Sequence, residues 1–223
     1  MTRVNRLIVV LIATISAMAA QADLTISQQI QKEGSPQDAD VRMTMKIREG
    51  KMRLDINPQV SSIVDLKTGD MISLMHPQKL MMTIPGASIK SMQAKAKEAA
   101  ESVGTNAEPP KPTGRKETIS GYACEEYETT ANGMTVHVWL TKDLPNIEKL
   151  MSELSTLAGA DPLSGLTKGQ QLPGFPIRTE IDATGGGKTT VTVIAVSENP
   201  LADSEFAVPD GYRPIQAPAP KGK

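Results

Sequence analysis

Apolar and polar residues alternate along much of the chain, with the period of two that is typical of β-strands buried on one face. The alternation is clearest in 41–48 and resumes in 52–56 after a short turn at 49–51. Further short apolar runs continue the pattern across the range 24–85, and the links between them are only a few residues long. Because parallel strands need long crossover connections, we predict an antiparallel meander over this range.

The period changes to that of an amphipathic helix in two places. In 86–103 apolar residues recur every three or four positions, with lysines and glutamates between them, and Gly104 follows. In 144–158 isoleucine, leucine and methionine form a similar stripe that ends at Gly159. We predict two helices, each lying over one face of the sheet as a lid.

Strand-like runs return at 116–130 and 134–141. The Asn132-Gly133 pair between them is a strong signal for a tight turn, because both residues adopt a positive φ easily. We therefore predict a second antiparallel hairpin after the first helix.

The last part of the chain predicts one more hairpin. Residues 177–182 and 189–197 alternate, and three glycines at 185–187 turn the chain between them. We predict a short edge strand at 206–212. The proline-rich tail 213–223 has too little apolar surface to form a core, so we predict it to be disordered.

Together these elements predict a mainly β (α+β) domain over 23–212. The fold is expected to be a curved antiparallel sheet or half-barrel with two lid helices, at about 86–103 and 144–158.

The first 22 residues have the three parts of a secretory signal peptide. Arg3 and Arg6 precede an apolar run at 7–20, and a small-x-small motif ends at Ala22, which predicts cleavage before Asp23. An uncleaved membrane anchor is the alternative, but this run of about fourteen residues is shorter than the roughly 20 that span a bilayer. We expect a periplasmic or secreted protein that is soluble after cleavage and not integral to the membrane.

The charge balance argues against nucleic-acid binding, and the cysteine content excludes an intrachain disulfide. The chain has 24 Lys and Arg and 25 Asp and Glu; without the two leader arginines the balance is 22 against 25, or −3. Such a chain lacks the concentrated basic face that nucleic acids require, and we expect no nucleic-acid partner. Its single cysteine, Cys124, cannot form an intrachain disulfide, and we predict that it is a buried, unreactive thiol.

Chemistry-bearing residues are too sparse for a catalytic or metal site. The only histidines are His76 and His137, and Cys124 with one histidine does not give the usual ligand set of zinc. Glu125 and Glu126 are neighbours on a strand, so they point to opposite faces and cannot act as an acid/base pair. We therefore predict no catalytic residue, no metal, no cofactor and no enzymatic activity.

The segment 186–189 reads Gly-Gly-Lys-Thr, like the end of a phosphate-binding loop. The full motif needs a glycine where this chain has Asp182, and it needs a helix after the loop. Strands are predicted on both sides, so we interpret the segment as a hairpin turn.

Methionines are frequent on the apolar faces of the predicted strands, whereas aromatic residues make up only 3% of the chain. Methionine adapts to irregular apolar shapes, so these residues either fill a core that lacks aromatics or line a deformable ligand cavity. Trp139 alternates with Val136 and Val138, so it lies on the opposite face of its strand from these aliphatic side chains. We predict that one of the helices covers this face and that Trp139 packs against it; contact with a ligand or partner is the alternative. The cavity candidates are Met43, Met45, Met52, Leu54, Met75, Met82, Met134, Val136, Val138 and Trp139.

Four motifs occur in order over roughly 41–212: Ser62–Gly69 followed by Met75–Lys79, Gly121–Tyr127 followed by Val138–Leu140, Phe175–Glu180, and Phe206–Tyr212. Together they resemble a bacterial exported family labelled domain of unknown function forty-four-twelve. The resemblance implies no activity and no functional residue, because the family has none established. The strand–helix–strand plan is also similar to that of the periplasmic lipoprotein carriers, half-open β-barrels whose helices cover an apolar cavity.

Two functions remain open from the sequence. The first is a carrier or receptor that binds an apolar ligand, a lipid or an acylated protein, under a helical lid. The alternative is an envelope protein–protein interaction module with a filled core and no small ligand. An empty or a packed space between sheet and helices would distinguish them.

Overall fold

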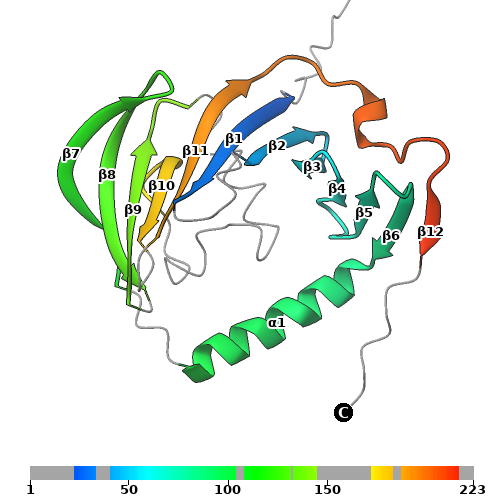
Figure 1. Cartoon of the computed structure of the whole chain (residues 1–223), viewed down its shortest axis with the longest axis horizontal. Helices are drawn as coiled ribbons and strands as arrows, with labels where there is room; N and C mark the ends of the chain where they lie inside the picture. The colour runs from blue at the N-terminus through cyan, green and yellow to red at the C-terminus, as the bar shows by residue number, and fades with distance from the viewer. Residues whose placement is uncertain are drawn as a thin grey trace, which may run out of the picture.

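A computed structural model describes residues 23–33, 41–103, 108–131, 133–144, 172–182 and 187–215. Its described part contains one sheet of twelve strands, one α-helix and one 3-10 helix (Figure 1). The strands are β1 Leu24–Lys32, β2 Val41–Arg48, β3 Lys51–Asn57, β4 Val60–Asp65, β5 Met71–Met75, β6 Leu80–Ile84, β7 Lys111–Ile119, β8 Tyr122–Ala131, β9 Met134–Thr141, β10 Phe175–Asp182, β11 Lys188–Ser197 and β12 Arg213–Ile215; the helices are α1 Gly86–Val103 and η1 Asp203–Phe206.

The strand order is β12-β6-β5-β4-β3-β2-β1-β11-β10-β9-β8-β7. Every pair is antiparallel except β12 with β6, which is parallel. The predicted meander is therefore confirmed for β2 to β6, and so is the hairpin of β8 and β9 at Gly133. The sheet curves so that α1 lies across its open side (Figure 1).

The predicted helix at 86–103 is confirmed with the same bounds as α1. Of the second predicted helix, 144–158, only Leu144 is described, and the rest lies outside the described residues. The leader 1–22 and the end of the tail, 216–223, lie outside them too. The described part of the sheet is thus accompanied by a single α-helix.

The C-terminal segment differs from the sequence prediction. The predicted strand at 206–212 is wrong: η1 ends at Phe206, and the edge strand is β12 instead. Residues 213–215, which we predicted to begin a disordered tail, pair with β6. Pro214 is compatible with β12 because an edge strand has backbone groups that need no ladder partner.

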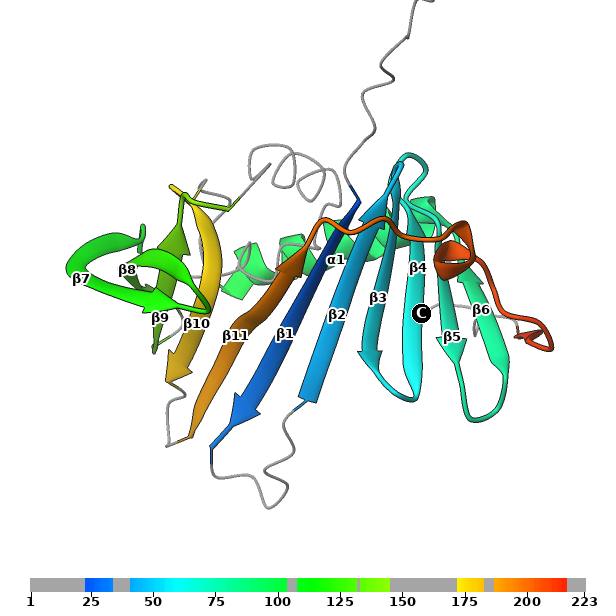
Figure 2. The ribbon, with the colours of Figure 1, turned by 90° about the horizontal axis from the view of Figure 1, so that it is seen from above.

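This segment covers one face of β2 to β5, on the side opposite α1 (Figure 2). Lys46 Nζ contacts Glu205 Oε2 at 2.6 Å, and Arg53 donates to the Glu205 carbonyl at 3.0 Å. Beneath this cover Leu74 is fully buried, and Phe206 of η1 is buried as well. The sheet therefore has a closed outer face here, and its inner face looks towards α1.

The start of α1 is fixed to the turn between β4 and β5. The Gly86 backbone N–H donates to Asp70 Oδ1 at 2.7 Å. A side chain at Gly86 would meet backbone, because its Cβ would lie 2.3 Å from the Thr68 carbonyl oxygen. Elsewhere in the described part of α1, no strand packs extensively against the helix.

Candidate ligand-binding face

The strand register places the predicted methionines of β2 and β3 on one face. Met45 lies opposite Leu54, and Ile47 lies opposite Met52. Because side chains alternate along a strand, Met43 shares the face of Met45.

The same face continues across β4 to β6. Leu54 lies opposite Ser62, Ser62 opposite Ser73, and Ser73 opposite Met82. Met75 is two residues from Ser73 and so points to the same side. This is the inner face, and we call the side chains of Met43, Met45, Leu54, Met75 and Met82 the methionine face.

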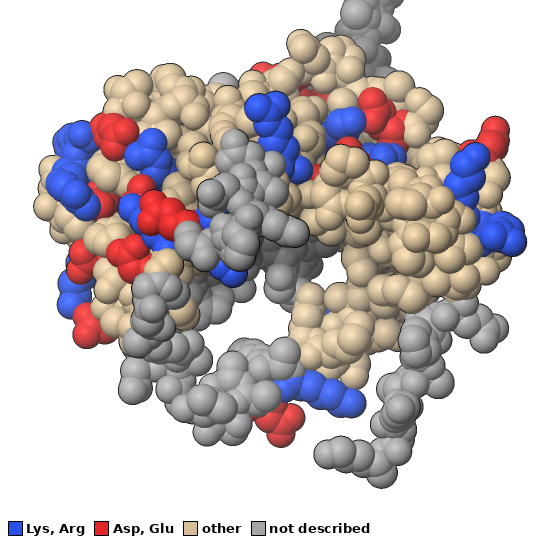
Figure 3. Space-filling view, viewed as in Figure 1, with Lys and Arg blue, Asp and Glu red and all other residues tan. Residues whose placement is uncertain are grey.

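The methionine face is apolar but only half-buried. All five side chains have intermediate exposure, whereas Met52, at the end near Ile47 and Val64, is 6% exposed and belongs to the core. In the space-filling view an open space separates α1 from the sheet (Figure 3). Met92 of α1 is 55% exposed. The described residues therefore leave much of this apolar surface without cover.

The β9 candidates divide between the two faces. Val136 and Val138 are fully buried with Leu140 in a second apolar cluster. Val138 lies opposite Thr179, which lies opposite Val191, so this cluster shares one side of the sheet with those two residues of β10 and β11. Met134 is half-buried at the start of β9.

Trp139 alternates with Val138 along β9 and belongs to the main core cluster, which also contains Met52 and against which Met45 packs. Trp139 lies opposite Glu126 in β8 and Arg178 in β10, and the Arg115 guanidinium is 5.7 Å from its ring centroid. The ring is 7% exposed, and its Nε1 has no hydrogen-bond partner among the described residues. The predicted cover is thus present, but its described part is a side chain of β7 rather than a helix.

Glu126, beside Trp139, is a buried carboxylate with a cation as its partner. Its side chain is 1% exposed, and both Arg115 and the Thr113 hydroxyl donate to it. Burial by itself raises the pKa of Glu126, but the hydrogen bonds from Arg115 and Thr113 outweigh it and hold the pKa below its usual value. His137 Nδ1 lies 3.2 Å from the same carboxylate.

A relay of half-buried side chains around the buried Ser61, which the sequence did not predict, joins the sheet to Tyr212. The Ser61 hydroxyl donates to Asp55 Oδ1 at 2.7 Å, because a carboxylate can only accept. Ser61 Oγ then accepts from His76 Nε2 at 2.6 Å, and His76 Nδ1 accepts from the Tyr212 hydroxyl.

The relay holds the C-terminal segment in place rather than preparing a nucleophile. A serine nucleophile must give its proton to the histidine, but the Ser61 proton is directed to Asp55. Ser61 is also 1% exposed. The only sequence signal for the relay is that His76 and Tyr212 both fall within the motifs quoted above.

Cys124 is 4% exposed and lies in the main core cluster, as predicted. Burial raises the pKa of its thiol. We expect native Cys124 to react with a maleimide far more slowly than in the unfolded chain, because little thiolate forms and access is blocked. Labelling at the same rate in both states would contradict a packing role.

The described residues contain neither a candidate metal site nor a candidate membrane-spanning helix. They contain no group of three or more His, Cys, Asp and Glu side chains placed to hold a metal. In the same part of the chain no helix has the length and apolar character to cross a membrane.

A family model described as domain of unknown function (DUF4412) matches residues 16–212. No curated protein sequence matches the chain.

Solved structures resemble the fold at low sequence identity. An uncharacterised conserved protein from Thermus thermophilus has a TM-score of 0.50 and 5% identity, covering 89% of this chain and 93% of its own. A LolA superfamily protein from Nitrosomonas europaea has a TM-score of 0.24 and 11% identity, and the match covers 84% of this chain and 90% of that protein. PNGF-II has a TM-score of 0.42 and 16% identity over 88% of this chain, which spans only 31% of that protein.

Proposed function

The chain belongs to the family described as domain of unknown function DUF4412, and we propose that it is an exported carrier or receptor for an apolar ligand. The ligand class is a lipid or the acyl group of an acylated protein, and the methionine face is its binding surface. The observation that carries the proposal is the half-buried state of these apolar side chains on the face of the sheet that looks towards α1.

Simple energetics support an acyl chain as ligand. Burying one methylene contributes about 0.8 kcal/mol, so a long chain gains affinity from a surface that offers no specific polar contact. Unbranched methionine side chains can adjust to chains of different shape. The proposed role requires no catalytic residue.

The attachment of α1 supports a movable cover. The helix is tied to the sheet through Gly86 and Asp70, and its middle is exposed at Met92. A helix whose described attachment to the sheet is at its start can shift to admit a ligand and then pack against it, as lids in the low-stability part of a structure do. Export by the leader would place this function in the periplasm or outside the cell.

Met82 and Met81 provide a matched pair for the test. They are neighbours on β6, but Met82 lies opposite Ser73 on the inner face and Met81 lies opposite Leu74 on the outer face. We expect Met82→Gln to weaken binding of the neutral fluorescent probe N-phenyl-1-naphthylamine about tenfold, because an amide in an apolar contact loses hydration without gaining a partner. Met81→Gln should leave the dissociation constant unchanged.

The outcome separates the two candidate functions. If the wild-type protein does not bind the probe, or if both substitutions weaken binding equally, the carrier proposal is wrong. A protein–protein interaction module with a filled inner face would then be the better interpretation.

A further inference from the structure

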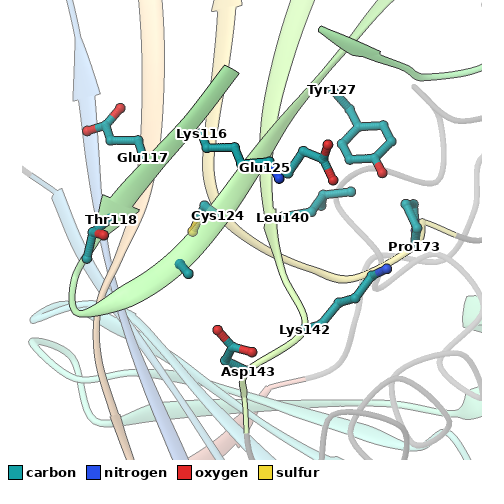
Figure 4. Close-up of a pocket in the computed structure, with 11 residues that line it drawn as sticks. Lys116, Glu117, Thr118, Cys124, Glu125, Tyr127, Leu140, Lys142, Asp143 and Pro173 are labelled. Carbon is teal, nitrogen blue, oxygen red and sulfur yellow. The ribbon is translucent and has the colours of Figure 1, made fainter. Parts of the chain in front are cut away.

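A pocket of about 370 Å³ lies at the β7–β9 end of the sheet (Figure 4). This volume is within the range of small-ligand sites. Leu140, Cys124, Ala123 and Pro173 provide apolar lining, together with the ring of Tyr127. None of the sequence motifs predicted this pocket.

The pocket opens on the same face of the sheet as the methionine face. Lys116 lies opposite Glu125, and Glu125 lies opposite Leu140, so these side chains share one side. Leu140 packs with Val138.

From Val138 the face runs without reversal towards β2. The ladder partners continue through Thr179, Val191 and Ile30 to Val41, two residues before Met43. The pocket and the methionine face therefore lie on the same side of the sheet, with β10, β11 and β1 between them.

The lining of the pocket contains Lys116 and Lys142 together with the carboxylates of Glu117, Glu125 and Asp143. Lys116 and Lys142 form no ion pair with any of the described residues. Glu117 is already paired with Arg178 at 3.3 Å. Glu125 accepts a hydrogen bond from the Tyr127 hydroxyl. The pKa of Tyr127 is raised, mainly by burial and to a smaller degree by the Glu125 carboxylate.

The side chains of Lys142 and Asp143, neighbours in the sequence, point in different directions. In Figure 4 the Lys142 amine points towards Pro173, whereas the Asp143 carboxylate points away from it. Two ammonium groups next to an apolar wall match a ligand that joins an anionic head to an apolar body.

We propose that this pocket binds the anionic head, a carboxylate or a phosphate, of an amphiphilic ligand, with Lys116 and Lys142 as its donors. Leu140 and Pro173 contact the first carbons of the apolar chain. The proposal rests on the carrier function and adds to it the class of headgroup.

The test compares decanoate, decyl phosphate and neutral decanol by isothermal titration calorimetry. We expect the wild-type protein to bind at least one of the two anions about tenfold more tightly than decanol, as one or two charge-assisted hydrogen bonds allow. The double variant Lys116→Gln/Lys142→Gln should lose this preference and keep its affinity for decanol. The stronger of the two anions identifies the headgroup as carboxylate or phosphate.

Lys111→Gln is the matched control, because Lys111 is on the same strand but pairs with Glu108 outside the pocket. Equal affinities for the anions and decanol, or a preference that survives the double variant, would overturn the pocket proposal. The Met82 test is independent, because its probe carries no anion. If the double lysine variant keeps the anion preference while Met82→Gln still weakens probe binding, only the pocket proposal is wrong. If Met82→Gln leaves probe binding unchanged while the double lysine variant loses the anion preference, only the assignment of the methionine face is wrong.

Discussion

Glu126→Gln is expected to lower the free energy of unfolding by about 1.5 kcal/mol at pH 7. The wild-type carboxylate accepts from Arg115 and Thr113, and the glutamine would turn an N–H donor towards the guanidinium. Hydrogen bonds to charged groups contribute about 1.5–3 kcal/mol, and we expect the lower end because Arg115 is 63% exposed and water screens the pair.

The difference between wild type and variant should depend on pH with a definite sign. The folded-state pKa of Glu126 is below the value in the unfolded chain, about 4.3. The carboxylate therefore contributes its full stability above the unfolded pKa and loses it as the pH falls through the folded pKa. Glutamine does not titrate, so the two unfolding free energies should converge in acid.

Urea unfolding across this pH range measures the effect, with Glu128→Gln as the control. Glu128 is on the same strand but 49% exposed, so its substitution should change the unfolding free energy by less than about 0.5 kcal/mol. A Glu126→Gln difference that stays constant into acid would show that the loss comes from packing and not from charge.

Local patterns predicted the strands because their cause is local. The alternation in 41–48 and 52–56 became β2 and β3, and the hairpin predicted from the Asn132-Gly133 pair is that of β8 and β9. Glu125 and Glu126 do point to opposite faces, one to the pocket and one to Arg115. Such features depend on neighbours within a few residues, which a single sequence contains.

Long-range pairings could not be predicted in this way. β1 joins β11, so the beginning of the domain lies beside strands near its end. Tyr212 reaches His76 across 136 residues. The β12–β6 pairing orders residues 213–215, which composition alone predicted to be disordered.

The candidate site was predicted in part for the same reason. Period-two spacing indicated which residues of each strand share a face, and the register then joined Met43, Met45, Leu54 and Met82 on one side. The pocket remained unpredicted because Lys116 and Lys142 come together only when β7, β8 and β9 are adjacent.

Gly86→Ala should detach the start of α1 from the sheet. The new Cβ would lie 2.3 Å from the Thr68 carbonyl oxygen and 2.8 Å from the Gly69 carbonyl carbon. Both are backbone atoms and cannot rotate away, so the helix start or the turn must move and the bond to Asp70 is lost. Overpacking of this kind costs about 1–3 kcal/mol.

Hydrogen exchange monitors the helix directly. In wild type we expect the amides of α1 to exchange more slowly when an apolar ligand such as N-phenyl-1-naphthylamine is added, because the helix closes on it. In Gly86→Ala they should exchange faster without ligand and respond less to it. Ser88→Ala is the control, since Ser88 is exposed two residues further along α1. If α1 exchanged alike in wild type and Gly86→Ala and slowed equally with ligand, the helix would not depend on its Gly86 attachment, and its role as a hinged cover would be wrong.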